Sequence, residues 1–220
     1  MVLWLYNRAT AIQRSREMFD PKPVTLSTNK VTLRPLIAED LAAFYQAGAF
    51  SEIWRWMSPN RCSSIAAAKS WLTETEDKVK KREHIAFAII DNKTNTLLGS
   101  TRYCSISVEN RNIEIGFTFI TPKYQQSYVN THAKYCLLKH AFETLSAIRV
   151  EFKTCENNNK SRQAITRLGA KFEGILRNQR ILPDGSYRNT AIFSVINDEW
   201  PMVKQNLTQK MEKKMVKYDE

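Results

Sequence analysis

The sequence predicts an α/β protein with a mostly antiparallel sheet and one strand-helix-strand crossover in the second half of the chain. Residues 113–120 alternate like a strand and lead through a polar loop, residues 123–130, into about sixteen residues with helical apolar spacing. A short buried strand, residues 149–155, follows that helix and completes the crossover. Strand patterns on both sides of the crossover are joined by short polar turns, which is typical of antiparallel hairpins.

The first half of the chain contains one strand, two helices and two further strands. In order, these elements are expected at residues 30–36, 39–49, 64–82, 84–91 and 96–108. Ser64 is a suitable N-cap for the second helix, because its hydroxyl can accept a hydrogen bond from a first-turn N–H group. An aromatic loop, residues 53–59, is expected between the two helices.

After the crossover the pattern predicts a helix, two long strands and a C-terminal helix. Residues 157–161 cap the helix at residues 162–168, which stops at Gly169. The strands at residues 171–182 and 187–196 are joined by the turn at residues 183–186, which contains Pro, Asp and Gly. We therefore expect one domain over residues 29–205, a helix or arm over residues 1–28, and a charged helical tail over residues 206–220.

The net charge of the chain indicates anionic partners without choosing among them. The 220 residues carry a formal charge of +11 with a pI near 9.6, which suits nucleic acid, a phosphate-rich cofactor, an acidic protein or a membrane surface. Part of the excess lies in two basic runs, residues 78–82 and 210–217, that fit solvated helix faces. No helix-turn-helix, zinc finger or basic ribbon interleaved with aromatics accompanies the charge. Ribosome or RNA association remains possible on charge alone.

Neither a metal site nor a membrane segment is expected. The four cysteines form no C-x-x-C pair, and His84 and His140 have no carboxylate or cysteine at ligand spacing. The apolar run at residues 2–6 is too short for a signal peptide or a membrane span. These features favour a cytoplasmic protein, with an organelle presequence as the alternative for the N-terminal segment.

The loop before the central helix is the expected functional site. A strand that leads into a helix start presents unpaired N–H groups and the positive end of the helix dipole, and both favour a phosphate group. The alternative is that this loop only caps the helix, with Ser127 as N-cap.

Short motifs extend from about residue 30 to about residue 205. They are Leu33-Arg34-Pro35, Ile113-Glu114-Ile115-Gly116, Asn130-Thr131 with Lys134, His140-Ala141-Phe142, Asn158 with Ser161, Leu168-Gly169-Ala170, Glu173-Gly174, Leu176-Arg177, Pro183-Asp184-Gly185 with Arg188, and Glu199-Trp200-Pro201. With the motifs in this order and spacing, the sequence resembles the GCN5-related N-acetyltransferases, and within them the branch that acetylates ribosomal-protein N-termini.

The resemblance implies a sheet that splays between the fourth and fifth strands and holds acetyl-CoA in the V. The pyrophosphate would lie on the loop before the central helix, where Tyr128 and Asn130 stand in place of the family's small residues. Glycine allows a backbone to approach phosphate closely, so Tyr128 either points away or narrows the site. The cofactor-binding residues implied are Phe117, Phe119, Gln125, Gln126, Ser127, Tyr128, Val129, Asn130, Asn158 and Ser161.

Two residues are candidates for proton transfer. Glu114 is expected on the polar face of its strand beside Gly116 and Thr118 and could border the cleft as a general base. The opposite face would hold Ile113, Ile115, Phe117 and Phe119. The alternative for Glu114 is a surface or ion-paired glutamate. The resemblance assigns the acid role to Ser161, which as an alternative only caps its helix, and places Arg180 near the position where this branch has a proposed base glutamate.

A site with few groups for proton transfer favours an α-amine as the acceptor. An α-amino group has a pKa of about 7.7–8.0 against about 10.4 for lysine, a difference worth roughly 3.4 kcal/mol in deprotonation. Trp54, Arg55 and Trp56 border the acceptor side in relatives and suit a peptide or an aromatic small molecule, with core packing as the alternative for the tryptophans.

The expected activity is acetyl transfer from acetyl-CoA to a primary amine, preferably a peptide or ribosomal-protein N-terminus. A small-amine acetyltransferase and a catalytically decayed CoA-binding or RNA-associated module are the alternatives, and either a monomer or a homodimer is compatible with the sequence.

Overall fold

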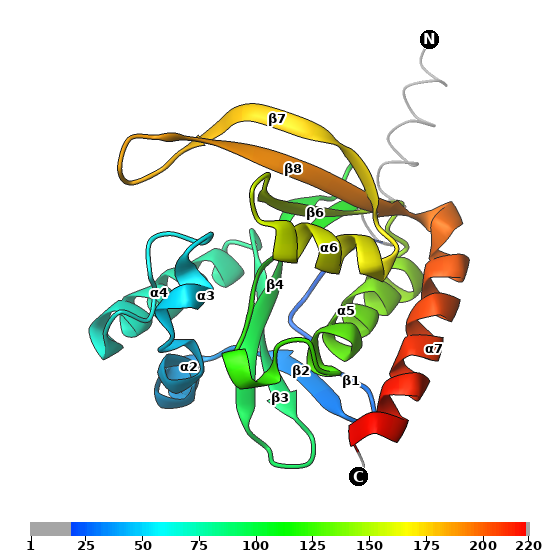
Figure 1. Ribbon diagram of the computed structural model, residues 1–220, viewed down its shortest axis with the longest axis horizontal. Coiled ribbons are helices and arrows are strands. Elements are labelled where there is room, and N and C mark those ends of the chain that lie inside the picture. The colour runs from blue at the N-terminus through cyan, green and yellow to red at the C-terminus, as the bar shows by residue number, and fades with distance from the viewer. Residues whose placement is uncertain (1–18, 219–220) are drawn as a thin grey trace, which may run out of the picture.

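Eight strands form one sheet in the computed structural model, which describes residues 19–218 (Figure 1). The strand order is β1-β2-β3-β4-β5-β6-β8-β7, and every neighbouring pair is antiparallel except β5 and β6. The strands are β1 (Leu26–Ser27), β2 (Val31–Pro35), β3 (Ile85–Asp91), β4 (Leu97–Ser107), β5 (Asn112–Ile120), β6 (Arg149–Cys155), β7 (Lys171–Ile181) and β8 (Tyr187–Ile196). The predicted fold class, mixed α/β with a mostly antiparallel sheet, is confirmed.

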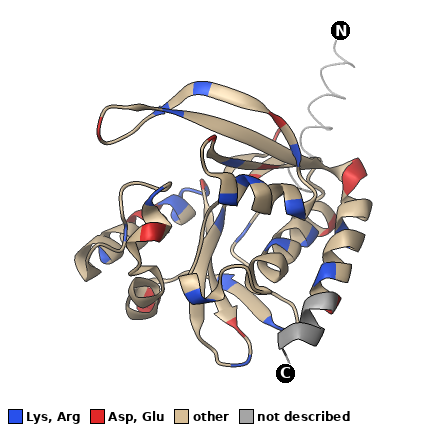
Figure 2. Ribbon diagram, viewed as in Figure 1, with Lys and Arg blue, Asp and Glu red and all other residues tan. Residues whose placement is uncertain are grey.

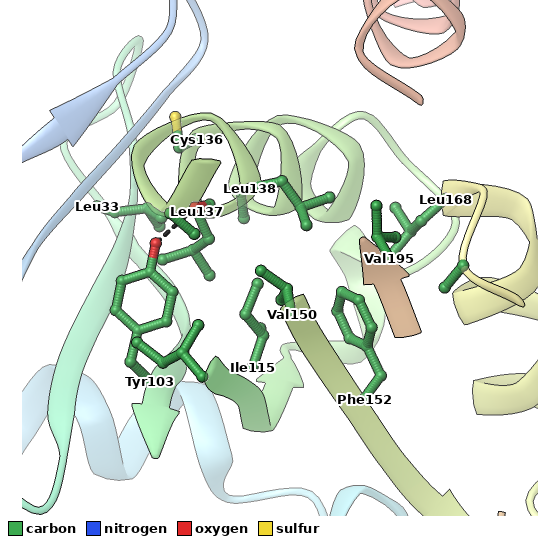
Figure 3. Packing of buried hydrophobic residues seen from close by; sticks show 14 of the residues in the cluster. Leu33, Tyr103, Ile115, Cys136, Leu137, Leu138, Val150, Phe152, Leu168 and Val195 are labelled. Atoms are coloured by element: carbon green, nitrogen blue, oxygen red, sulfur yellow. Dashed lines mark hydrogen bonds between the residues drawn. The ribbon is translucent and has the colours of Figure 1, made fainter. Parts of the chain in front are cut away.

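Helices cover both faces of the sheet and bury a separate apolar cluster on each side. The helices are α2 (Leu41–Gly48), α3 (Ser51–Trp54), α4 (Ile65–Lys80), α5 (Val129–Lys139), α6 (Asn159–Leu168) and α7 (Trp200–Tyr218). The larger cluster packs α5, α6 and α7 on one face, and the smaller packs α2, α3 and α4 on the other. Figure 3 shows the larger cluster under α5, where the buried Tyr103 hydroxyl donates a hydrogen bond to the Leu137 carbonyl at 2.5 Å.

The capping residues act as expected, although α6 begins at Asn159 and the prediction began this helix at residue 162. Ser64 accepts from the Ala67 N–H, Asn158 accepts from the Ser161 N–H, and Gly169 ends α6 with φ 102°. Helix α5 continues through a π-helical turn, His140–Thr144, so the predicted length of about sixteen residues is confirmed. The segment predicted as an aromatic loop begins inside α3, which the sequence pattern did not reveal.

The two terminal segments join the domain where the structure describes them. Most of the predicted arm, residues 1–18, lies outside the described residues. Phe19 is fully buried in the larger cluster, and β1 pairs with β2. At the other end, α7 begins at Trp200 and buries Leu207 in the same cluster. Within residues 19–218, no helix has the length and hydropathy needed to cross a membrane.

A β-bulge in β5 corrects the predicted faces of that strand. Phe117 has φ 49°, and the register with β4 shifts between the Arg102 to Gly116 pair and the Ser100 to Phe119 pair. The extra residue reverses the alternation beyond it. Thr118 therefore lies on the α5 face, where its hydroxyl contacts Lys134, while Phe119 packs in the cluster of α2 and α3. The expectation that Thr118 shares a face with Glu114 was wrong.

Candidate functional site

The parallel strands β5 and β6 pair over three residues and then separate. Their register joins Asn112 to Arg149, Ile113 to Val150 and Glu114 to Glu151. Beyond this vertex, residues 115–120 of β5 and residues 152–155 of β6 have no pairing with each other. Such an opening leaves backbone donors and acceptors on both inner edges, which a ligand with an extended amide chain can satisfy. The splay predicted between the fourth and fifth strands is thus present between β5 and β6.

Glu114 lies at the vertex and is held by two partners. Its Oε2 accepts hydrogen bonds from Lys153 Nζ and Ser105 Oγ, each at 3.0 Å. A Cβ at Gly116 would come within 3.0 Å of Glu114 Oε1, so glycine leaves room for the carboxylate. The ion-paired alternative for Glu114 is the one that the structure contains, and it holds the carboxylate at the vertex of the V.

Lys153 joins Glu114 to Glu151 across the vertex. Its Nζ lies 3.0 Å from a carboxylate oxygen of each residue. Burial alone would lower the pKa of Lys153, but the Glu114 and Glu151 carboxylates outweigh it and raise that pKa. Arg149 extends the network by binding Glu151 at 2.9 Å and Glu173 at 2.7 Å. Every cation of this vertex therefore has a carboxylate partner.

The loop before α5 turns its tyrosine away from the V and toward the end of β3. The Tyr128 hydroxyl donates to Asp91 Oδ1 at 2.7 Å, which fits the first of the two orientations expected from the sequence. Gln125 and Gln126 are exposed, and Gln125 Nε2 donates to the Ile120 carbonyl. The N-cap position is Tyr128, while Ser127 Oγ accepts from the Val129 N–H at 3.3 Å.

The start of α5 offers backbone N–H groups for an anion. First-turn N–H groups of a helix have no acceptor inside the helix and lie at the positive end of its dipole. Asn130 belongs to this turn with its side chain half-exposed, whereas the Val129 side chain is fully buried in the core. Val129 can therefore contact a ligand through its backbone alone. The open strand edges and this helix start together fit a chain with amide groups and a phosphate end.

Asn158 and Ser161 stand at the start of α6, which follows β6. The Asn158 side chain is occupied as the N-cap, whereas the Ser161 hydroxyl forms no hydrogen bond within the part of the chain that the structure describes. Both residues are partly exposed. The predicted capping role belongs to Asn158, and Ser161 keeps a hydroxyl available for another partner.

The aromatic segment around α3 divides between core and surface. Trp54 is 5% exposed, donates from Nε1 to the Gly48 carbonyl at 2.8 Å and packs on Phe119. Arg55 is exposed and stacks over the Trp56 ring at 5.2 Å. Core packing, the alternative given for the tryptophans, therefore describes Trp54, whereas Arg55 and Trp56 remain at the surface.

Arg102 is a buried cation beside the bulge on the α4 side. Its guanidinium lies 4.5 Å from the Trp71 ring and 4.9 Å from the Phe117 ring, which sandwiches it between aromatic faces. Nη1 contacts His84 Nδ1 at 3.0 Å, and burial lowers the pKa of His84 to about 4. His84 is consequently neutral and accepts this hydrogen bond. No carboxylate of the described residues forms an ion pair with Arg102.

Lys134 is a second buried cation, on the opposite face of the same bulge. Its Nζ donates to Thr118 Oγ1 at 2.6 Å and to Thr101 Oγ1 at 3.2 Å. Burial lowers the pKa of Lys134 to about 7. From the sequence, Lys134 was recognised only as part of a family motif and Arg102 was not singled out, because the surroundings of both depend on the bulge that turns Phe117 and Thr118 to opposite faces.

The family assignment follows from a family model that describes an acetyltransferase (GNAT) domain and matches residues 30–171. The chain belongs to the GNAT acetyltransferases. It is an acetyl-CoA-dependent acetyltransferase, as the motifs around the V implied.

Solved structures agree with this assignment. A GCN5-related N-acetyltransferase from Brucella melitensis is similar at 27% identity with a TM-score of 0.81, covering 87% of this chain and 86% of that chain. Two further structures have identities that establish the fold alone. Mycobacterium smegmatis RimJ in complex with CoA-disulfide has 19% identity and a TM-score of 0.73 over 86% and 95% of the two chains. Ribosomal-protein-S5-alanine acetyltransferase from Vibrio fischeri has 17% identity and a TM-score of 0.65 over 80% and 98%.

Proposed function

We propose that this acetyltransferase acetylates the α-amine of a peptide or protein N-terminus. The amine would be acetylated directly, within a ternary complex with acetyl-CoA. One similar structure carries a ribosomal-protein acetyltransferase name, which supports this acceptor class, and another holds a CoA derivative, which supports the cofactor. The cofactor would lie in the V, with its pyrophosphate on the backbone of residues 125–130 and its amide chain on the open edges of β5 and β6.

The position of Glu114 is the observation that carries the proposal. Its carboxylate lies at the vertex of the V, where Lys153 and Ser105 already donate to one of its two oxygens. With that oxygen occupied, the site has limited means of removing a proton. An α-amine, which loses its proton at a lower pH than a lysine side chain, therefore suits this site better.

The proposed proton transfers use two residues on opposite sides of the opening. The amine nitrogen bonds to the thioester carbonyl carbon as the carbon–sulfur bond breaks. Glu114 accepts the proton that the amine loses, and Ser161 donates its hydroxyl proton to the departing thiolate and then recovers one from water. Phe117 and Phe119 contribute through their backbone, because the Phe119 side chain is 5% exposed inside the smaller cluster.

An acceptor panel tests the proposed substrate class. The purified protein is incubated with acetyl-CoA and with peptides that carry either a free α-amine or an acetyl-blocked α-amine plus one lysine. Mass spectrometry is expected to find acetylation on the free α-amine and at least tenfold less on the lysine. Acetylation of polyamines or amino-acid derivatives in preference to every peptide would replace this proposal with the small-amine activity.

Calorimetry tests the proposed cofactor position. Asn130→Asp places a negative charge at the start of α5, where a phosphate would be repelled, and is expected to weaken acetyl-CoA binding at least tenfold. Asn95→Asp, in the exposed β3–β4 turn, introduces the same charge away from the V and serves as the control. Equal affinities of both variants would remove the cofactor from this loop.

A further inference from the structure

The β7–β8 hairpin brings two arginines together as direct cross-strand partners. Arg180 and Arg188 are paired in the antiparallel register of this hairpin. Like charges in directly opposed positions destabilise a strand pair. Neither arginine forms an ion pair with a carboxylate of the described residues, whereas Arg34 binds one carboxylate and Arg149 binds two. The hairpin therefore holds two positive charges that the described part of the chain does not neutralise.

Arg188 is held in place although it has no counter-ion. Its Nη2 donates to Thr190 Oγ1 at 2.9 Å, and the Thr190 hydroxyl donates in turn to Gln179 Oε1 at 2.9 Å. Arg188 Nε is buried without a hydrogen-bond acceptor in the described structure. A buried donor left unpaired destabilises the folded state. An incoming anion would relieve both this cost and the repulsion from Arg180.

The arginine pair belongs to the open end of the V. Strand β8 is the neighbour of β6, and Thr190, two residues beyond Arg188, pairs with Cys155 at the end of β6. Burial lowers the pKa of Arg188 and Arg180 lowers it further, while the negative charge of Glu114 acts in the opposite direction. Arg188 is therefore within electrostatic range of the residue proposed as the base.

The surroundings of the pair fit a peptide. Figure 1 shows the hairpin extending past β6 and over the side of the molecule that carries α3 and α4, and Figure 2 shows basic residues along it. Leu176 pairs with Thr190, which lies on the same face of β8 as Arg188, and Leu176 is 44% exposed. An open groove of about 580 Å³ on the hairpin is lined by Ile175, Leu176, Arg177, Asn178 and Asn189. An exposed apolar side chain on the face of the guanidinium groups matches the side chains of a peptide better than it matches a sugar-phosphate backbone.

The acidic residue in the hairpin turn does not neutralise the arginines. Asp184 lies in the turn, where its carboxylate accepts from the Ser186 N–H at 2.9 Å and from the Ser186 hydroxyl at 2.6 Å. Asp184 thus stabilises the turn, and the guanidinium pair stays available to a ligand.

We propose that Arg180 and Arg188 form a carboxylate-binding subsite for the acceptor, so that the preferred substrate is a peptide with an Asp or Glu side chain close to its free α-amine. This inference rests on the proposed function. A guanidinium binds a carboxylate through two parallel hydrogen bonds. An anion bound between two guanidinium groups attracts both of them and offsets the repulsion between them. The subsite would hold the acceptor while its amine approaches Glu114.

Matched peptides test the subsite. Two peptides that differ by one Glu or Gln next to the N-terminal residue are acetylated by the wild-type protein and by Arg180→Gln, Arg188→Gln and Lys93→Gln. Lys93 is exposed in the β3–β4 turn, so its variant removes one charge away from the hairpin. The wild type and Lys93→Gln are expected to use the Glu peptide at least tenfold better in kcat/KM. Either arginine variant should reduce this preference to twofold or less, with an unchanged rate on the Gln peptide.

The possible outcomes separate this inference from the proposed function. Equal use of the Glu and Gln peptides by the wild type would overturn the subsite and leave α-amine acetylation intact. Acetylation of small amines with no peptide modified would overturn both proposals. Salt-sensitive binding of RNA that both arginine variants lose, with no preference between the peptides, would assign the pair to nucleic acid and also overturn the subsite. Circular dichroism of each variant confirms that the hairpin substitutions leave the fold intact.

Discussion

The vertex of the V and the β7–β8 hairpin differ in whether their basic side chains have carboxylate partners within the described structure. At the vertex, Lys153 lies between Glu114 and Glu151, and Arg149 lies between Glu151 and Glu173. On the hairpin, Arg180 and Arg188 oppose each other with no carboxylate partner in the described structure. Buried or half-buried charges are normally paired because desolvation is costly. The difference indicates that the fold supplies the counter-ions at the vertex, whereas a ligand supplies them on the hairpin.

The bulge in β5 repeats this contrast in the interior. Lys134 and Arg102 lie on opposite faces of the bulge, and each contacts neutral groups instead of carboxylates. A buried cation without an acidic partner lowers the stability of the fold, because no opposite charge offsets its desolvation. Both cations adjoin residues 116–118, which form the inner edge of the V, so we expect them to position that backbone for acyl transfer.

The largest expected effect comes from replacing the two carboxylates of the vertex one at a time. Glu114→Gln should lower kcat about 100-fold or more, because general-base catalysis contributes roughly 10²- to 10⁴-fold, while acetyl-CoA affinity stays unchanged. Glu151→Gln removes the other carboxylate bound to Lys153 and should change kcat less than threefold. Steady-state kinetics with a peptide acceptor and calorimetry with acetyl-CoA measure the two effects. Equal losses in both variants would attribute the effect to the ion-pair network instead of a base.

The next effect concerns the buried amine of Lys134. Its pKa falls from 10.5 to about 7 on folding, so between these pH values the unfolded chain binds a proton that the folded chain does not. The free energy of unfolding contributed by this group therefore rises from pH 7 to pH 10.5, by roughly 3–5 kcal/mol in total. Lys134→Met should remove this rise, which urea unfolding at pH 6.5 and pH 9 measures.

The same substitution separates stability from function. Lys134→Met should raise the free energy of unfolding at pH 6.5 by about 1–3 kcal/mol, as is found when apolar residues replace buried charges. It should also lower kcat, because Thr118 loses the donor that fixes it beside the bulge. Loss of stability at pH 6.5 would show that the ammonium group is well accommodated, and would contradict the contrast drawn here.

Local patterns predicted the fold well because they depend on residues close in sequence. The apolar face of α5, the caps at Ser64 and Asn158, and the stop at Gly169 are all properties of a few neighbouring positions. The bulge at Phe117 was not predictable in this way, since it depends on how β5 aligns with β4. Because the prediction did not include the bulge, it placed Thr118 on the wrong face of β5 and did not bring Thr118 next to Lys134.

The site was predicted in part for the same reason. Glu114 and Ser161 lie on the elements expected for them, and the splay of β5 and β6 follows the resemblance. The partners of Glu114 come from β4 and β6, and the pairing of Arg180 with Arg188 requires the hairpin register. Such long-range neighbours leave no periodic signal in the sequence. Lys134 was visible as a basic residue of the predicted central helix, but its burial, with 5% of the residue exposed, was not predictable.

The smallest expected effect compares two lysines that both form ion pairs. Lys153 has a side chain 25% exposed between two carboxylates that the parallel register places opposite each other. Lys153→Gln leaves Glu114 and Glu151 to repel each other and should lower the free energy of unfolding by about 1–2 kcal/mol. Lys80 on α4 pairs with Glu76 at 2.9 Å with its side chain 71% exposed, so Lys80→Gln should change stability by less than about 0.5 kcal/mol. Urea unfolding at two salt concentrations measures both. A loss for Lys80→Gln as large as that for Lys153→Gln would mean that exposure does not set the strength of these pairs, and that the vertex network is ordinary surface electrostatics.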